Sequence, residues 1–306
     1  MAVYVNTNVS SLNGQRYLNN VQNSLNTTYQ RLSSGLRINS AKDDSAGLQI
    51  ADRLTSQING LNQGNRNAND GIALAQTIEG GLDEVSNMLQ RMRTLAVQSA
   101  NGTLGTNDRV SILNEADQLT AEISRIATDT TFGGKTILAG YAADSTSIYG
   151  AATTATVNGN DASAGKLTLH VGANTGDTIS MAVFNFKFSM LAEAAGLGAS
   201  DAYVDEGFNL SKQADANAAI AGIDKMIAVV DSQRAELGAI QNRLESSIRN
   251  QANVSANSAD ARSRIRDADF AEESANLSQQ SIIQQAATSM LMQANTRPQL
   301  ALSMLG

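Results

Sequence analysis

Residues 274–306 read SANLSQQSIIQQAATSMLMQANTRPQLALSMLG, and Arg297 carries the only charge in this stretch. Apolar residues recur in it at helical spacing, and the remaining positions are mostly Gln, Ser, Thr and Asn. A helix with one face in water normally carries Lys, Glu or Arg there, because these side chains are strongly hydrated and favour helices. Neutral hydrogen-bonding groups suit a helix that other protein encloses, where a charge would be costly. The stretch therefore predicts an enclosed helix and not a membrane span.

The opposite end of the chain has the same character. Residues 1–30 carry one charge, Arg16, and leucines follow a heptad spacing through the first predicted helix, residues 8–34. We predict that the two terminal helices pack on each other and on further copies of the chain. The predicted self-assembly seam consists of Leu18, Leu25, Tyr29, Leu32, Leu277, Ile283, Ala287, Met290 and Leu291.

Composition limits the class of protein. Of the 306 residues 42% are hydrophobic but only 4% are aromatic, and there is a single Pro, which favours long, closely packed helices. The net charge of −7 argues against nucleic acid or an anionic membrane as partner. The start lacks the basic and apolar regions of a cleaved signal peptide, and no run of about 18 apolar residues could span a bilayer.

The helical pattern continues inward from both ends. Heptad stripes predict long helices over residues 44–99 and 211–260, and a shorter helix over 107–128. Any one stripe could be an ordinary helix face in a globular core, but five such segments together favour a bundle that assembles. The predicted fold is mainly α: an elongated antiparallel helical bundle or coiled coil with a small β-hairpin region inserted in the middle. Its predicted domains are a terminal coiled coil (1–43 with 261–306), a long-helix bundle (44–140 with 206–260) and a short variable region (141–205).

The variable region has a different composition and a different hydrophobic pattern. Residues 166–171 and 178–183 alternate apolar and polar side chains around a turn-like Asn174–Asp177, which predicts a β-hairpin. Residues 141–165 are rich in Ala, Thr, Ser and Gly, which is typical of an exposed loop or a small excursion of the chain. Residues 141–211 contain seven acidic and two basic residues, a net charge of −5. Ser145, Thr146 and Ser147 are candidate acceptors for O-linked sugar, although surface loops are often Ser/Thr-rich without modification.

Two charged linkers, residues 33–44 and 260–269, are predicted to lie side by side because the order of elements is nearly palindromic. Two solvated loops are the equally weighted alternative. The ion pairs that could form would join Asp43 and Asp44 to Arg262, Arg264 and Arg266.

Residues that could carry chemistry are scarce. The chain has no Cys and one histidine, His170, which lies in a predicted strand, so a transition-metal site has too few ligands. Gly133-Gly-Lys lacks the spacing of a phosphate-binding loop. We predict no enzyme activity, no catalytic residue, no metal and no cofactor.

Four longer strings make the chain resemble bacterial flagellin. They are residues 30–48 (QRLSSGLRINSAKDDSAGL), 89–101 (LQRMRTLAVQSAN), 232–244 (SQRAELGAIQNRL) and 300–306 (LALSMLG). The resemblance covers roughly residues 1–140 and 210–306. It implies an extracellular helical homopolymer, the filament used in swimming motility, with little or no outer domain here. It also implies export by the flagellar type III channel without a cleaved signal, with an export chaperone and hook-associated and cap proteins as partners.

The resemblance further implies recognition of the monomer by Toll-like receptor 5. The family's contact motif matches Gln90, Arg91 and Leu95, with Glu115 on the next helix. Arg91 and Leu95 are an i, i+4 pair and are predicted to share one face. Many flagellins have an acidic residue where Thr94 stands.

Two alternatives remain at this stage. A hook–filament junction protein of related architecture would form a short ring and not a long polymer. An enzyme carried in a flagellin-like frame would need a sizeable middle insertion with a metal or nucleophile set, and residues 141–211 supply one His and no Cys.

Overall fold

The computed structural model describes residues 7–141, 146–157, 160–197, 202–204 and 207–303. Its contacts group the chain into two compact units. Unit 1 contains Met1–Ile58 and Ser255–Gly306, and unit 2 contains Asn59–Val254. Unit 1 therefore extends further into the long helices than the predicted terminal domain, which comprises residues 1–43 and 261–306.

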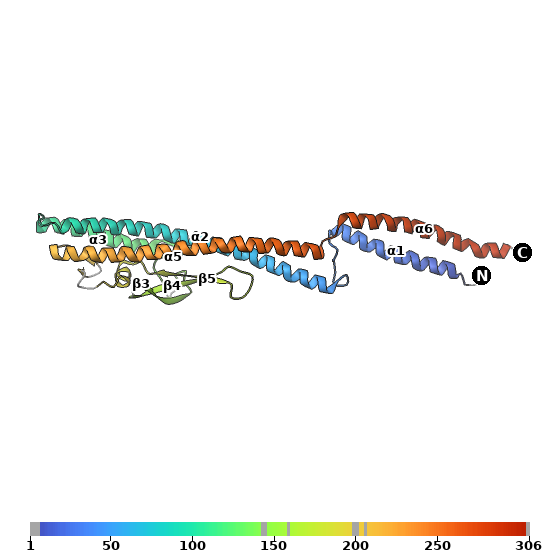
Figure 1. Ribbon diagram of the computed structural model, residues 1–306, viewed down its shortest axis with the longest axis horizontal. Helices are drawn as coiled ribbons and strands as arrows, with labels where there is room; N and C mark the ends of the chain where they lie inside the picture. Colours follow the sequence, from blue (N-terminus) through green and yellow to red (C-terminus); the bar gives the residue numbers. More distant parts are fainter. Residues whose placement is uncertain (1–6, 142–145, 158–159, 198–201, 205–206, 304–306) are drawn as a thin grey trace. The chain divides into compact units, whose positions relative to one another are not determined.

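The described chain is mainly helical, as the sequence predicted (Figure 1). The helices are α1 (Val9–Ser34), α2 (Ser45–Ser99), α3 (Thr106–Asp129), α4 (Phe188–Ala194), α5 (Gln213–Arg266) and α6 (Phe270–Ser303). The longer strands are β3 (Ala151–Val157), β4 (Asn160–His170) and β5 (Thr178–Phe184). Two short hairpins pair β1 (Thr131–Phe132) with β2 (Lys135–Thr136) and β6 (Tyr203–Val204) with β7 (Gly207–Phe208).

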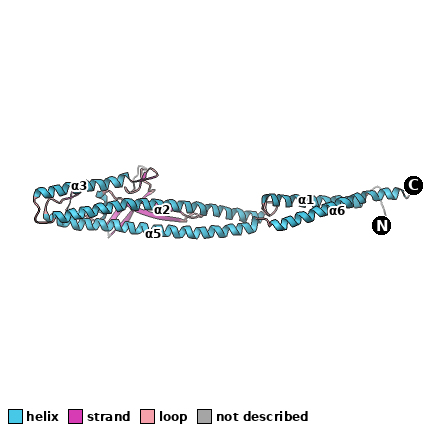
Figure 2. Cartoon of the chain, turned by 90° about the horizontal axis from the view of Figure 1, so that it is seen from above, coloured by secondary structure: helices cyan, strands magenta, loops and turns pink. Residues whose placement is uncertain are grey.

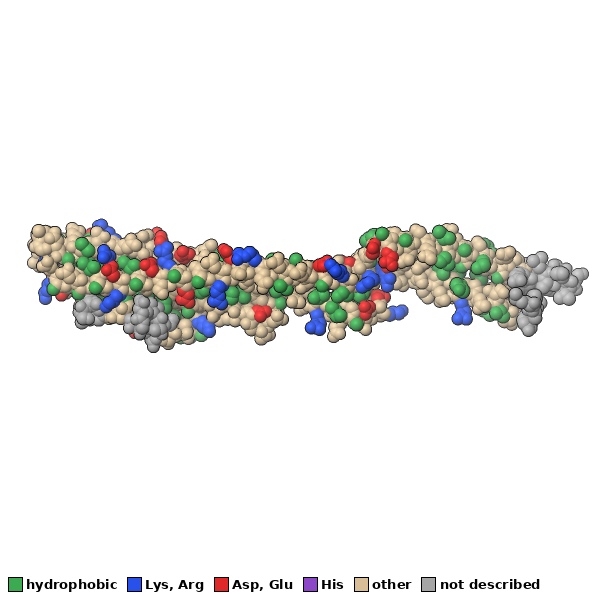
Figure 3. Space-filling model, in the orientation of Figure 1, with side chains coloured by type: hydrophobic (Ala, Val, Ile, Leu, Met, Phe, Trp, Pro, Cys, Tyr) green, Lys and Arg blue, Asp and Glu red, His purple; other side chains and the backbone are tan. Residues whose placement is uncertain are grey.

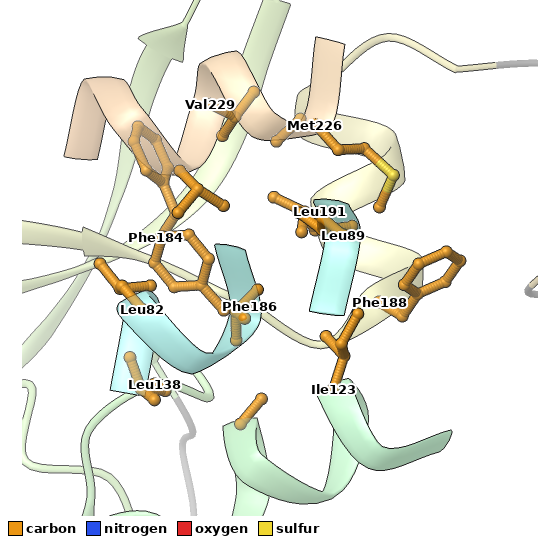
Figure 4. Packing of buried hydrophobic residues seen from close by; sticks show 14 of the residues in the cluster. Leu82, Leu89, Ile123, Leu138, Phe184, Phe186, Phe188, Leu191, Met226 and Val229 are labelled. Carbon is orange, nitrogen blue, oxygen red and sulfur yellow. The ribbon is translucent and has the colours of Figure 1, made fainter. Parts of the chain in front are cut away.

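In unit 2, α2 and α5 run side by side, and α3 packs beside them (Figures 1 and 2). The heptad stripes explain this arrangement, because their members are buried along the facing sides of the helices. Phe184, Phe186 and Phe188 fill the space between α2, α3 and α5 (Figure 4). The buried stripe residues are Leu61, Ala68, Ala75, Leu82, Leu89 and Ala96 on α2, and Ile223, Val230, Leu237 and Leu244 on α5.

The middle of the chain forms an antiparallel sheet in the order β3–β4–β5. The predicted hairpin is present, with Thr168 paired to Ser180 and His170 to Thr178. The loop expected over residues 141–165 is partly wrong, because Ala151–Val157 is a strand that pairs with residues 160–166 of β4. The β3 sequence, AATTATV, has too little contrast in hydrophobicity between successive residues to give a strand signal.

The sheet is fastened to the helices at close range. A Cβ added to Gly64 of α2 would lie 2.5 Å from the backbone oxygen of Val171, so only glycine allows this approach. Asn67 donates to the carbonyl of His170 at 2.8 Å, and Gln251 of α5 donates to the carbonyl of Val171. Earlier in α5, the side-chain amide of buried Gln233 forms hydrogen bonds with backbone groups of Phe184 and Ala182 at the outer edge of β5.

The two linkers do lie side by side, but not through the expected ion pairs. Leu36 forms an antiparallel bridge with Asp267, and the N–H of Arg37 donates to the carbonyl of Arg266 at 2.7 Å. Gly35 allows the turn into this linker, since it takes a left-handed conformation (φ 71°) after α1.

The acidic residues of the first linker bind backbone groups instead of arginines. Asp43 accepts the N–H of Ser40 at 2.9 Å and that of Asn39 at 3.1 Å. These hydrogen bonds, Ser40 first, lower the pKa of Asp43. Asp44 accepts the N–H of Gly47 at 2.9 Å, at the start of α2. The expected pairing with the arginines was therefore wrong, because nearby N–H groups satisfy both carboxylates.

Candidate self-assembly surface

Within unit 1, α1 and α6 pack against each other along a seam. Leu25 and Thr28 of α1 are 5% and 4% exposed, and Ala287 of α6 is 9% exposed. The leucines at heptad spacing lie along one stripe of α1, and this stripe packs against α6. The half-buried residues Leu18, Leu32, Leu277 and Leu291 complete this inner seam.

Two polar contacts fix the pairing. At the N-terminal end of α1, Asn8 caps the helix, because its Oδ1 accepts the N–H of Ser11 at 3.1 Å. The Nδ2 of Asn8 donates to the carbonyl of Ala294 at 2.8 Å. Near the linkers, Arg31 of α1 pairs with Glu273 of α6 at 3.1 Å. The Glu273 side chain is only 8% exposed, and a buried carboxylate is costly unless it is paired. These contacts set the register of the two helices.

The remaining predicted seam residues do not face the inner seam. Tyr29, Ile283 and Met290 are 54%, 39% and 69% exposed. Other large apolar side chains of unit 1 are exposed as well, and sequence reasoning did not single them out. They are Val9, Leu12, Tyr17, Ile50, Phe270, Ile282 and Met292. With the exception of Ile50, which belongs to α2, these residues lie on α1 and α6, so the helix pair carries an outer apolar surface that the described residues leave exposed.

Part of this surface is a groove between the two helices. Its walls include Tyr17 of α1 with Ile283 and Met290 of α6, and Ala287 lies among its lining residues. On the face seen in Figure 3, the described surface of α1 and α6 is mainly apolar and neutral polar, with few charges. Such a surface costs little to remove from water, since few charged groups lose their hydration.

The predicted receptor-contact residues lie on α2 and α3 in unit 2. Gln90 is exposed, and Arg91 forms an exposed ion pair with Glu115 at 2.6 Å. Leu95 is only 1% exposed and belongs to the core. Leu95 continues the buried stripe of Leu89 and Met92, so it does not accompany Arg91 at the surface of the folded chain.

The candidate sugar acceptors differ in accessibility. Thr146 is exposed, whereas Ser147 is 4% exposed and its Oγ accepts the N–H of Tyr149 at 3.2 Å. This burial argues against Ser147 as an acceptor. Ser145 lies outside the described residues.

Among the described residues, no group of three His, Cys, Asp or Glu could hold a metal ion. No described helix combines the length and hydrophobicity that crossing a membrane requires.

Comparison with protein families finds matches at both ends of the chain. The bacterial flagellin N-terminal helical region matches residues 5–143, and the bacterial flagellin C-terminal helical region matches residues 220–305. Flagellin D of Vibrio anguillarum is 37% identical over 377 aligned positions, covering 100% of both chains. Flagellin B of Vibrio cholerae serotype O1 is also 37% identical, over 379 positions with the same coverage. Both alignments exceed 306 positions, so these relatives contain residues that this chain lacks.

Solved structures give weaker matches. A flagellar hook-associated protein from Vibrio parahaemolyticus, so described, aligns with 72% of this chain and 100% of its own at a TM-score of 0.52. At 20% sequence identity this likeness concerns the fold alone. The crystal structure of Bacillus cereus flagellin aligns with 61% of this chain and 88% of its own, at 30% identity and a TM-score of 0.43.

Proposed function

The chain belongs to the bacterial flagellin family, and from that premise we propose that the α1–α6 pair is the surface through which its copies polymerise. Family membership makes the chain a structural subunit of the extracellular flagellar filament. Swimming motility follows from the family. Among the described residues, the terminal helices combine many exposed large apolar side chains with few charged ones.

The observation that carries the proposal is the exposure of Tyr17, Met290 and Ile282, at 71%, 69% and 67%. Fully burying a side chain of this size contributes about 1.5–3 kcal/mol. Several such side chains on each subunit supply a driving force for association with further copies. The third of the predicted seam residues that is exposed (Tyr29, Ile283 and Met290) is then covered by neighbouring subunits.

A surface substitution tests this proposal without touching the inner seam. Met290→Asp places a charge on the outer surface, and Asn242→Asp places the same charge on an exposed position of α5. Seeded polymerisation is measured by sedimentation and negative-stain microscopy. We expect long filaments from the Asn242→Asp chain and none from the Met290→Asp chain. Normal filaments from both variants would contradict the assignment of this surface.

The filament is the preferred assembly over a short junction ring. Full-length identity of 37% to proteins named flagellins supports this choice, whereas the hook-associated protein shares only the fold. We also propose the partners that the family suggests: hook-associated and cap proteins, a flagellin-specific export chaperone and the flagellar type III export channel. Thr146 is the accessible candidate for O-linked sugar among the described residues.

A second proposed role is recognition of the monomer by Toll-like receptor 5. The exposed pair of Arg91 and Glu115, with Gln90 beside it, supports a polar contact patch. Leu95 supports that patch from the core and does not touch a partner directly in the folded chain.

A further inference from the structure

Methionine is the only side chain of this protein that carries sulfur, because the sequence contains nine Met and no Cys. Peroxides oxidise the thioether of Met to a sulfoxide when they can reach the sulfur. Among the described residues, an oxidant reaches the two methionines of α6 most readily. Met290 and Met292 are 69% and 65% exposed, Met190 is 38% exposed, Met88 is half-buried, and Met92, Met181 and Met226 are at most 1% exposed.

Both exposed methionines of α6 lie on the surface that we assign to polymerisation. Met290 lines the groove between α1 and α6 together with Tyr17 and Ile283. Met292 follows two residues later, which places it about 200° further around the helix. Sulfur is therefore accessible on two sides of α6, whereas the most deeply buried methionines belong to the hydrophobic core of unit 2.

Oxidation adds a polar atom to this apolar surface. The sulfur lone pair attacks one oxygen of hydrogen peroxide, so that an S–O bond forms, the O–O bond breaks and water leaves. Sulfur loses two electrons, and the peroxide gains them. The sulfoxide oxygen accepts hydrogen bonds from water, and a neighbouring subunit that covers it must replace them. One unpaired oxygen should therefore raise the subunit concentration needed for polymerisation by about tenfold.

We propose that Met290 and Met292 form an oxidation site at which sulfoxide formation prevents the free subunit from polymerising. The proposal rests on the assignment of the α1–α6 surface to polymerisation. In a formed filament, neighbouring subunits cover both sulfurs and protect them. The site then makes assembly, and not the finished filament, sensitive to peroxide.

Oxidation of the full-length free subunit tests which methionines react. The subunit is treated with hydrogen peroxide, and the sulfoxide at each Met is measured over time by tandem mass spectrometry. We expect Met290 and Met292 to react severalfold faster than Met181 and Met226, and equal rates would overturn the proposal. The same treatment of preformed filaments should oxidise Met290 and Met292 severalfold more slowly than in the free subunit. Equal rates in filament and free subunit would also contradict the proposal.

Seeded polymerisation of the oxidised subunit tests the consequence. Sedimentation should show severalfold less filament than from the untreated subunit at the same concentration. Two methionine sulfoxide reductases, one for each sulfoxide epimer, should then restore polymerisation. Normal polymerisation of the oxidised subunit, or a loss that the reductases do not reverse, would overturn the proposal.

Substitution by leucine identifies the sulfurs that are responsible. The measured quantity is the filament yield of each chain with peroxide divided by the yield of the same chain without it. Met190→Leu removes an exposed sulfur from unit 2 and should leave this ratio as low as in the unchanged chain. The double variant Met290→Leu/Met292→Leu should bring the ratio close to one, and an unchanged ratio would assign the effect to another methionine. If the double variant forms no filaments, recovery of the unchanged chain by the reductases decides the question.

Met290→Asp separates this inference from the proposed function, because its effect needs no oxidant. If Met290→Asp abolishes filaments but the sulfoxides do not, the polymerisation surface stands and the oxidation site is wrong. Filaments from Met290→Asp would contradict the surface itself, whichever methionines react with peroxide.

Discussion

Gln233 of α5 holds the outer edge of β5 by accepting the backbone N–H of Phe184 at 3.3 Å through its Oε1. The Nε2 of the same side chain donates to the carbonyl of Ala182 at 3.0 Å. Gln233 is 0% exposed and Phe184 is 4% exposed, so the N–H of Phe184 depends on this amide and not on water. One side chain therefore joins the sheet to the helix bundle at two points.

Replacing this amide should weaken unit 2. Gln233→Leu leaves the buried N–H of Phe184 without a partner and also removes the partly buried bond to the Ala182 carbonyl, and an unsatisfied buried group costs about 1–3 kcal/mol. We expect a loss of that order in the free energy of unfolding, measured by urea denaturation. Gln241→Leu is the control, because the bond of Gln241 to Glu79 is only partly buried and water can replace it. Equal losses in both variants would mean that the β5 edge has no special dependence on Gln233.

The sheet approaches α2 closely at Gly64, whereas nothing lies close to Gly80. Replacing glycine by alanine should therefore have opposite effects on stability at these two positions. Gly64→Ala brings a Cβ to 2.5 Å from the Val171 oxygen, so the hairpin must move away. Gly80→Ala meets nothing within 4 Å and should stabilise by up to about 1 kcal/mol through helix propensity. Urea denaturation should give opposite signs, and hydrogen exchange at residues 169–179 should rise only for Gly64→Ala. Stabilisation by both substitutions would contradict the close docking.

The inner seam of unit 1 should not accept a carboxylate. Ala287→Asp places the new group at a position only 9% exposed, and an unpaired buried carboxylate costs several kcal/mol. We expect no sedimentable filaments, while the melting of unit 2 followed by circular dichroism stays unchanged. Ala287→Ser brings its own donor and acceptor and should polymerise. Normal filaments from the Asp variant would show that this seam is hydrated.

The receptor proposal is tested at Arg91. Removing an interface Arg typically costs more than 1 kcal/mol, so Arg91→Ala should weaken signalling by purified monomer by about tenfold on receptor-bearing cells. Arg125→Ala, which breaks a comparable exposed pair with Glu122 on α3, should have no effect. Equal signalling by the Arg91→Ala and Arg125→Ala chains would contradict the proposed receptor contact at Arg91. Leu95→Ala should instead destabilise the core by about 2–5 kcal/mol.

Asp43 makes the first linker sensitive to acid. Hydrogen bonds from Ser40 and Asn39 lower its pKa in the folded chain, so its contribution to stability is fully present above the unfolded pKa of about 3.9. That contribution is lost as the pH falls through the lower folded pKa. A carbon-13 titration should give a lower midpoint for Asp43 in the folded chain than in urea. In Asp43→Asn, this part of the pH dependence of stability should disappear, and identical midpoints would contradict the geometry.

The helices could be predicted because their stripes repeat many times. The spacing of Leu82, Leu89 and Ala96 predicts a buried helix face, and all three residues are buried in the structure. The end of α5 was harder, since charged residues 260–266 look like a linker but stay helical, with Asp260 and Arg264 paired at 2.9 Å one turn apart. The break falls at residues 267–269, where the chain bridges back to Leu36.

The candidate surface was predictable only in part. Helical spacing placed Leu25, Ala287 and Met290 in one predicted seam, but it could not tell that Met290 is exposed while Leu25 and Ala287 are buried. That distinction depends on how α6 is rotated against α1, which contacts such as Asn8 with Ala294 help to set. Likewise, no sequence pattern marks Gln233 among the many glutamines as the one that meets β5. Such contacts join residues far apart in the chain and leave no local periodic signal.

The pairing of Arg31 with Glu273 joins residues 242 positions apart. Closing a loop of that length in an unfolded chain is entropically unfavourable, whereas α2 and α5, once paired, hold the two linkers together and shorten the loop to be closed. The bundle then acts as a tether that raises the effective concentration of α1 for α6. We therefore expect an order of events in folding, in which the middle of the chain consolidates first and its two ends meet last. The α1–α6 pair is then the last part of the subunit to fold, and it is also the surface that, in our proposal, neighbouring subunits cover.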